Sequence, residues 1–221
     1  MPDTLQRWWT MGWPMGRSVD SSRWVVLDCE SSGLDVRRDR LLSVAAVALH
    51  FDAPGRATIR PGDSFEVLLR HSRPEAAPAK ANILLHGIGV GAQQQGVEPA
   101  RALQALRAYV GHSPLLAFHA AFDRALIDRA CKAALGARLA NPWLDLAPLA
   151  AALHPEVKAL ALDDWLAHFG IRCARRHQAA ADAWATAELL LRLLPALRAL
   201  HPGGGLRAAA AVVAQRRWLA R

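Results

Sequence analysis

The chain has 221 residues, 52% of them hydrophobic and 21% charged, a composition that can bury a core and excludes a disordered protein. Its 27 basic and 19 acidic residues give a net charge of +8, which favours a polyanionic partner. No apolar run approaches the ~20 residues of a membrane-spanning helix, so we expect no membrane association. Three widely separated cysteines exclude a disulfide framework and indicate a reducing, cytoplasmic location.

The first third of the chain predicts an antiparallel meander of three strands. Short apolar, β-branched runs predict strands at 24–29, 41–51 and 64–70. Proline and glycine at 54–55 and 61–62 predict the turn between the second and third strands. Residues 71–97 are rich in proline, glycine and glutamine, and we expect a long loop there.

The rest of the chain predicts helices that alternate with short strands. Pro99 begins a helix, and the strand expected at 114–118 should run parallel to an earlier strand because a helical crossover precedes it. A fifth strand is expected at 142–146. The remaining predicted helices are 121–135, 162–169, 178–194 and a last helix after the glycines 203–205. Pro195 is expected to end the helix at 178–194.

Four carboxylates are predicted to face the sheet. Asp28 and Glu30 lie two residues apart on the first strand and therefore share one face. Asp123 and Asp182 each begin the apolar stripe of a helix, so both point inward, where an unpaired carboxylate is costly. A shared divalent cation would relieve the repulsion, whereas simple solvation of the strand-end acids is the alternative.

His177 precedes the helix that carries Asp182 and follows a cationic run formed by Arg172, Arg175 and Arg176. A histidine beside an inward-facing acid and several arginines suits a general base that acts on a phosphate substrate. The alternative interpretation of the arginines is a solvated loop.

Three segments with these residues resemble the DnaQ-like 3′–5′ exonucleases of the DEDDh branch, the family of the proofreading epsilon-type domain. They are VVLDCESSGL (Val25–Leu34), FHAAFD (Phe118–Asp123) and HQAAAD (His177–Asp182), in the family's order. The resemblance implies an α/β, ribonuclease H-like fold with a mixed five-stranded sheet, an antiparallel meander plus parallel strands, flanked by helices. In this sequence Ser31-Ser32 replaces the family's threonine pair, and Phe118-His119 replaces its His-Asn pair.

The resemblance also implies a mechanism. Two Mg²⁺ or Mn²⁺ ions would be held by Asp28, Glu30, Asp123 and Asp182, with His177 as the general base. The enzyme would release nucleoside 5′-monophosphates from the 3′ ends of DNA, with RNA as the alternative substrate.

Further residues follow from the same resemblance. Ser31 and Leu34 stand where the family cradles the terminal nucleotide. Apart from the resemblance, the cationic residues Arg172, Arg175 and Arg176 are candidates to contact the strand backbone. Two alternative functions are an accessory proofreading subunit that binds a DNA polymerase, and a non-catalytic nucleic-acid-binding module.

We expect three parts in the chain: a tryptophan-rich extension at 1–22, an exonuclease domain at 23–200 and a basic C-terminal helix at 201–221. The tryptophans of the extension either pack on the domain surface or dock a partner. The glycines at 203–205 are the best candidate for a hinge.

Overall fold

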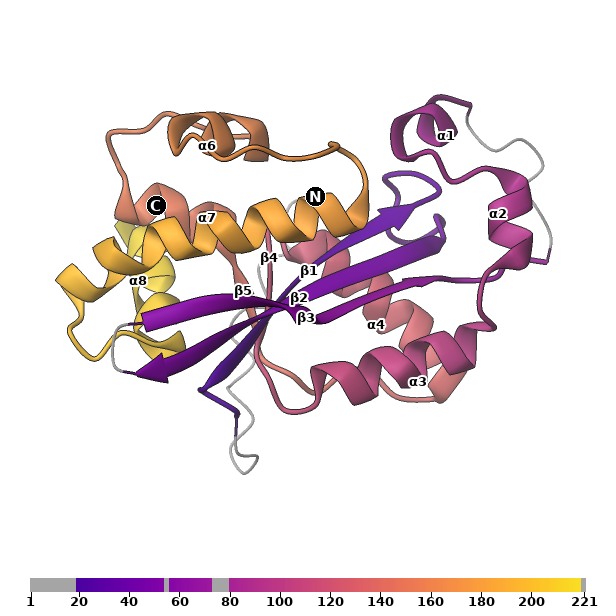
Figure 1. Ribbon diagram of the computed structural model, residues 1–221, viewed down its shortest axis with the longest axis horizontal. Coiled ribbons are helices and arrows are strands. Elements are labelled where there is room, and N and C mark those ends of the chain that lie inside the picture. The colour runs from indigo at the N-terminus through magenta and orange to yellow at the C-terminus, as the bar shows by residue number, and fades with distance from the viewer. Residues whose placement is uncertain (1–18, 54–55, 73–79, 220–221) are drawn as a thin grey trace.

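The computed structural model describes residues 19–53, 56–72 and 80–219, built around one five-stranded sheet (Figure 1). The strand order is β3-β2-β1-β4-β5. β1 pairs antiparallel with β2, and β2 with β3, while β4 runs parallel to both β1 and β5. The predicted mixed sheet is confirmed. The strands are β1 (Arg23–Ser31), β2 (Leu41–Ala53), β3 (Arg56–Leu68), β4 (Leu115–Ala117) and β5 (Trp143–Asp145).

Helices cover both faces of the sheet. They are α1 (Lys80–His86), α2 (Val90–Gln95), α3 (Pro99–Val110), α4 (Ala121–Leu135), α5 (Leu146–Leu153), α6 (Leu162–His168), α7 (Ala179–Leu200) and α8 (Leu206–Leu219). α3 and α4 lie on one face, and α7 crosses the other (Figure 1). No helix in the described ranges is long and apolar enough to cross a membrane.

The alternation of side chains along β1 builds two cores. Trp24 and Val26 pack beneath α7, whereas Val25, Leu27 and Cys29 pack beneath α3 and α4. Because both faces of this central strand are buried, its sequence is apolar almost throughout until the first acid. The strand therefore holds the residues that follow it in a fixed position between the two helical layers.

The structure corrects the prediction of a long loop at 71–97. α1 and α2 lie within this range and contain seven and six residues, too few to show a clear helical period in the sequence. The sequence also gave no prediction for α5, whose N-cap is Asp145.

Two proline positions also differ from the prediction. Pro61 and Gly62 lie inside β3, in a bulge where residues 60–63 stand opposite Ala48 alone, and not in the turn. Pro195 lies inside α7, which continues to Leu200. Burial of Leu193, Leu194 and Leu197 on the same helix offsets the hydrogen bond that Pro195 cannot donate.

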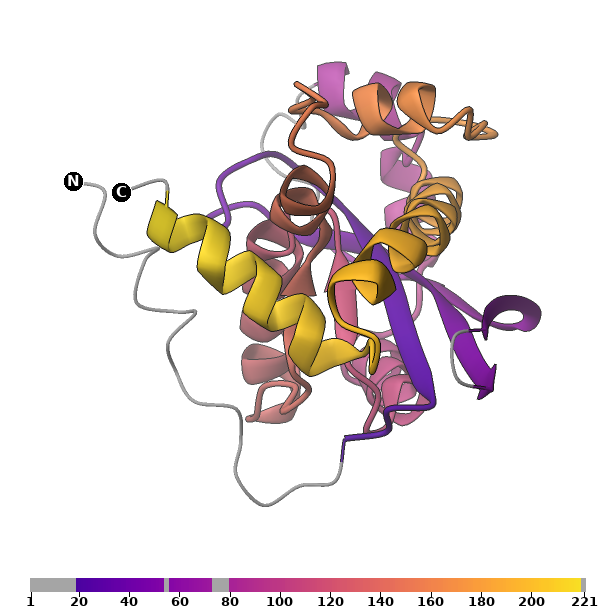
Figure 2. The ribbon, with the colours of Figure 1, turned by 90° about the vertical axis from the view of Figure 1, so that its left-hand side faces the viewer.

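α8 belongs to the core beneath α7. It packs against α5 (Figure 2), and its buried residues include Leu206, Ala209 and Val213. A hinge at the preceding glycines would have to break these apolar contacts. The boundaries of the predicted extensions stay predictions, and residues 1–18 with their tryptophans lie outside the described part of the chain.

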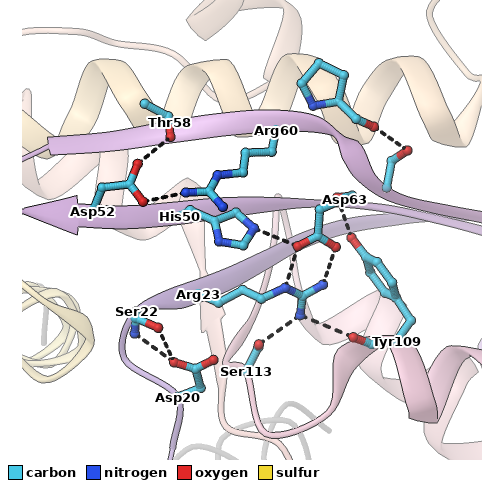
Figure 3. Close-up of polar contacts among 12 residues, drawn as sticks. Asp20, Ser22, Arg23, His50, Asp52, Thr58, Arg60, Asp63, Tyr109 and Ser113 are labelled. Atoms are coloured by element: carbon cyan, nitrogen blue, oxygen red, sulfur yellow. Dashed lines mark hydrogen bonds and ion pairs between the residues drawn. The ribbon is translucent and has the colours of Figure 1, made fainter.

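A polar cluster fastens the amino end of β1 to the β3 bulge (Figure 3). Arg23 Nη2 lies 2.7 Å from Asp63 Oδ1, and His50 Nε2 lies 2.6 Å from Asp63 Oδ2. The hydrogen bonds from Arg23 lower the pKa of Asp63 to about 2. The Tyr109 hydroxyl donates to the Asp63 carbonyl, and the Arg23 guanidinium lies 4.7 Å from the centre of the Tyr109 ring. This cluster stabilises the end of β1 opposite to the acidic residues.

Candidate active site

Asp28 and Glu30 lie at the carboxyl end of β1. β1 keeps its pairing with β2 up to Glu30, opposite Ser43, and the register shifts between Glu30 and Ser31. The strand thus leaves regular pairing directly after the second acid. Because the preceding residues of β1 are buried, both carboxylates start from a rigid backbone.

Asp182 reaches the same place from the first turn of α7. Its carboxylate is buried, and oxygen atoms of Asp28, Glu30 and Asp182 all lie within 4.8 Å of one another. α7 packs along β1 and β2, and Thr186 and Leu189 on the face of Asp182 are also buried. The predicted inward orientation of Asp182 is therefore found, and we call these three residues the acidic cluster.

Asp123 approaches from the opposite helical layer. It lies in the first turn of α4, is only 4% exposed and interacts with the Cys29 thiol. It is not among the residues within 4.8 Å of one another, but its charge raises the pKa of Asp28. The structure thus gathers three of the four predicted ligands and places the fourth beside them.

The electrostatics of the cluster favour a bound cation. Burial raises the pKa of Asp28 well above its usual value, and the charges of Asp123, Asp182 and Glu30 add to this effect. Burial and the charge of Asp182 raise the pKa of Glu30 to about 7. Burial also raises the pKa of Asp123 to about 7, although its contact with Cys29 opposes the shift. Ionised together, these groups repel one another.

Arg176 brings positive charge to this cluster. Its Nη1 donates to Asp182 Oδ1, and its Nε donates to Asp163 Oδ1 at 2.5 Å. The same charge lowers the pKa of Asp28 and of Glu30. In this structure Arg176 therefore binds acids, while its predicted contact with a strand backbone stays a prediction.

His177 is exposed beside the buried Asp182. Its φ is 59°, in the left-handed region, and its backbone N–H donates to Asp182 Oδ2 at 2.9 Å. The Asp182 side chain thus fixes the backbone of the turn that carries the exposed His177. An exposed ring nitrogen in this position can accept a proton from water.

The predicted substrate-binding residues surround the end of β1. Ser31 Oγ donates to the carbonyl of Gly33 at 2.6 Å and closes the turn, and Leu34 is 88% exposed. Arg175 is exposed, and its guanidinium lies close to Gly87, which directly follows α1. Leu34 and Arg175 are thus both exposed to solvent.

Sequence reasoning missed two features of this region. Asn82 Nδ2 on α1 donates to the Ser32 carbonyl at 2.5 Å, which attaches α1 to the turn after β1. Asp145 is buried at the end of β5, and its Oδ1 accepts from the backbone N–H of His119 at 3.0 Å. The only sequence signal for Asp145 was its suitability as an N-cap before an apolar helix.

The donor set of the acidic cluster fits a hard divalent cation. It consists of carboxylate oxygens from Asp28, Glu30 and Asp182, with Asp123 adjacent. Oxygen ligands of this kind suit Mg²⁺, Mn²⁺ and Ca²⁺.

Comparisons with known proteins agree with this site. The family model described as "Exonuclease" matches residues 25–190. "DNA polymerase III PolC-type" of Bacillus subtilis is 31% identical over 179 residues, which are 80% of this chain and 12% of that protein. "DNA polymerase III subunit epsilon-like protein" of Rhodobacter capsulatus is 31% identical over 184 residues, 82% of this chain and 25% of that protein. The chain therefore spans a quarter or less of these relatives.

Solved structures share the fold. E. coli exonuclease I in complex with a dT13 oligonucleotide superposes with a TM-score of 0.65 at 19% identity, over 81% of this chain and 42% of the other. A second exonuclease I structure gives a TM-score of 0.64 at 18% identity, over 85% of this chain and 42% of the other. The arrangement of sheet and helices is thus that of a known group of folds.

Proposed function

Because this chain belongs to the exonuclease family, we propose that it is a metal-dependent 3′–5′ exonuclease that hydrolyses phosphodiester bonds and releases nucleoside 5′-monophosphates. The observation that carries the proposal is the acidic cluster, where carboxylate oxygens of Asp28, Glu30 and Asp182 lie within 4.8 Å of one another. The exposed His177 is attached to the same cluster through its backbone.

Asp28, Glu30, Asp123 and Asp182 would hold two Mg²⁺ or Mn²⁺ ions. When bound, such a pair of ions supplies Lewis acidity that favours both the attacking water and the leaving oxygen. The chain would contribute four carboxylates from β1, α4 and α7 to hold the ions. Burial of Asp123 and Asp182 limits the access of competing water.

His177 would accept the proton of the attacking water at an imidazole nitrogen. Its backbone is held by Asp182 at 2.9 Å, so the ring has a defined origin close to the cluster. His177 is exposed and can pass the proton on to solvent after the reaction.

Substrate contacts would come from the rim of the site. Ser31 and the exposed Leu34 follow the acids of β1 and would cradle the terminal nucleotide. Arg175 and Arg176 would contact the strand backbone, Arg176 after release from its acidic partners. We propose DNA as the substrate, because E. coli exonuclease I with a similar fold was solved with a dT13 oligonucleotide; RNA is the alternative.

The test is digestion of matched 5′-labelled DNA and RNA oligonucleotides with Mg²⁺, with Mn²⁺ and with EDTA. A ladder that shortens from the 3′ end, only with metal, is the expected result. Release of the label first as a mononucleotide would contradict the 3′–5′ direction. A strand blocked at its 3′ end controls for internal cleavage, and Asp182→Asn controls for contaminating nucleases.

A second candidate is an accessory proofreading subunit that acts mainly through a DNA polymerase. The observation in its favour is the similarity to two relatives whose names are those of DNA polymerase III proteins. Co-purification of a polymerase with the full chain, and its loss when residues 1–20 or 206–221 are removed, would support this role. Deletion of 206–221 also removes core residues of α8, so a thermal melt must accompany that variant.

A non-catalytic nucleic-acid-binding module is the third candidate. Such a module would bind a nucleic-acid strand without any metal-dependent digestion. Digestion in the oligonucleotide experiment would therefore exclude it, and binding without digestion would support it. A cytoplasmic location is also proposed, because the cysteines are free, as expected in a reducing compartment.

A further inference from the structure

Two histidines have the same unusual backbone geometry. Among the described residues, His119 and His177 are the non-glycine residues with positive φ, at 60° and 59°. Each donates its backbone N–H to a buried aspartate, His119 to Asp145 at 3.0 Å and His177 to Asp182 at 2.9 Å. Each also precedes a helix that carries one of the predicted metal ligands. A left-handed residue of this kind persists only where its surroundings fix it, and such strain concentrates at functional sites.

Asp145 fixes the turn that contains His119. It is buried at the end of β5, and its Oδ1 also accepts from the Ala147 N–H at 3.1 Å. The His119 carbonyl accepts from the Phe122 N–H at 3.1 Å, which joins the turn to α4. The histidine backbone is therefore held from both sides, although glycine or asparagine would adopt this conformation with less strain.

The parallel pairing of β1 and β4 brings His119 to the edge of the sheet that carries the acids of β1. β4 is parallel to β1, with Leu115 opposite Val25 and Leu116 opposite Val26. β4 ends at Ala117, and His119 lies in the turn directly beyond it, at the same edge of the sheet as the carboxyl end of β1. Four residues after His119, α4 provides Asp123.

The His119 side chain is available to a ligand. The residue is exposed, and its ring packs edge-on against Phe118, with ring centres 4.7 Å apart and planes at 71°. This contact restricts the ring to one side of the turn. An exposed imidazole N–H on this turn is a potential donor for an anion.

We infer that His119 is a substrate-binding residue that donates a hydrogen bond to a phosphate oxygen of the nucleic-acid strand. The inference rests on the proposed function and adds a second histidine to the site. His177 directly precedes the helix that carries Asp182, and His119 the helix that carries Asp123, so the two histidines come from the two helices that provide acids to the site. Asp145 is then a positioning residue that acts through the His119 backbone.

The test compares His119→Ala, His119→Gly and His119→Asn with wild type. For His119→Ala we expect KM to rise about tenfold, because one hydrogen bond to a charged phosphate is lost. The value of kcat should change by less than about threefold. Glycine accepts the left-handed backbone but has no side chain, so His119→Gly should show the same rise in KM. Asparagine keeps an N–H donor and should restore part of the affinity.

His112→Ala is the matched control, because His112 is an exposed histidine at the opposite end of β4. Its KM should equal that of wild type. An unchanged KM in His119→Ala would overturn the inference. A wild-type KM in His119→Gly would also overturn it, since the backbone and not the imidazole would then matter.

A binding measurement separates this inference from the proposed function. Fluorescence anisotropy of a 5′-labelled oligonucleotide in EDTA reports affinity without any hydrolysis. One outcome is that the wild-type protein shows no digestion, yet His119→Ala binds the strand about tenfold more weakly than wild type. The proposed function is then wrong, and the inference about His119 stands. If wild type digests the strand and both measurements are unchanged in His119→Ala, the inference alone is wrong.

Discussion

Arg176 donates to Asp182, one of the three carboxylates of the acidic cluster. The guanidinium and a divalent ion bound at the proposed site would therefore compete for the same carboxylate. Arg176 also binds Asp163 on α6, so a metal ion that displaces Arg176 from Asp182 leaves it a second partner. The ion pair would thus link the occupancy of the proposed metal site to the position of the loop that precedes α7.

Arg176→Gln should consequently bind Mn²⁺ more tightly. Removal of a partly exposed ion pair of about 1 kcal/mol should lower the Mn²⁺ dissociation constant about fivefold. Isothermal titration calorimetry of the metal-free protein measures this. Arg172→Gln removes the same charge from an exposed position in the same loop. Equal changes in both variants would mean that only the net charge matters and that the ion pair does not compete.

The pH dependence of stability should reveal the crowded carboxylates. The pKa values of Glu30 and Asp123 are raised to about 7 from ordinary values of 4.5 and 3.8. Between these limits the folded protein keeps protons that the unfolded chain has released. In EDTA, the free energy of unfolding should therefore fall as the pH rises from about 4 to about 7. Urea unfolding at pH 5 and pH 7.5 measures the difference; equal stabilities would contradict the shifts.

Asp28→Asn should relieve this repulsion. The variant should be about 1 kcal/mol more stable than wild type in EDTA at pH 7.5, or roughly 2–4 °C in Tm. It should also gain less stability from Mn²⁺, because it lacks one ligand. Thermal melts with and without Mn²⁺ test both effects. A lower Tm in EDTA together with a wild-type response to Mn²⁺ would make Asp28 a structural residue.

The features that the sequence predicted well have strong local signals. The family and the mixed sheet inferred from three motifs are confirmed. α4 begins and ends where predicted, because an apolar stripe fills it and Gly136 ends it with a φ of 71°. The acids of β1 follow from simple alternation, since Trp24 and Val26 share their face.

The features that escaped prediction depend on tertiary contacts. α1 and α2 are too short for periodicity, and the α7 helix continues past Pro195 because its apolar face is buried. The contact between Asp145 and His119 joins residues 26 positions apart, which no local pattern encodes. The pairing of Arg176 with Asp182 likewise requires knowledge of where the preceding loop folds.

Asp63→Asn should reduce stability without affecting the active site. Arg23 is 15% exposed in its side chain and would lose its carboxylate partner. The expected loss is about 1.5–3 kcal/mol, measured by urea unfolding at pH 7. Because Asp63 and its partners lie at the amino end of β1, away from the acidic cluster, kcat and KM should stay unchanged at a temperature well below Tm. A stability within 0.5 kcal/mol of wild type, about the usual effect of a surface substitution, would contradict this role.

The lowered pKa of Asp63 gives this variant a second signature. In the wild-type protein, the stabilising contribution of the Asp63 carboxylate is present above the unfolded pKa of 3.8 and is lost as the pH falls from there to about 2. Asp63→Asn should therefore lose less stability than wild type between pH 4 and pH 2. This window lies below that of Glu30 and Asp123, so the two effects can be measured separately.

His177→Ala should separate proton transfer from metal binding. As the proposed general base, His177 should contribute about 10²–10⁴ to kcat. The hydrogen bond that it makes to Asp182 comes from its backbone N–H, which the substitution retains. The Mn²⁺ dissociation constant should therefore stay close to that of wild type, whereas Asp182→Ala should raise it strongly.

Alanine fits the φ of 59° poorly, so His177→Asn is the matched variant, with a side chain that tolerates the left-handed region but cannot act as a base. Both variants should lose kcat to a similar extent while binding Mn²⁺ normally by titration calorimetry. If His177→Asn keeps the wild-type kcat, the imidazole is not the base. If either variant loses as much Mn²⁺ affinity as Asp182→Ala, His177 is a metal ligand or a support for one, and the proton must leave by another route.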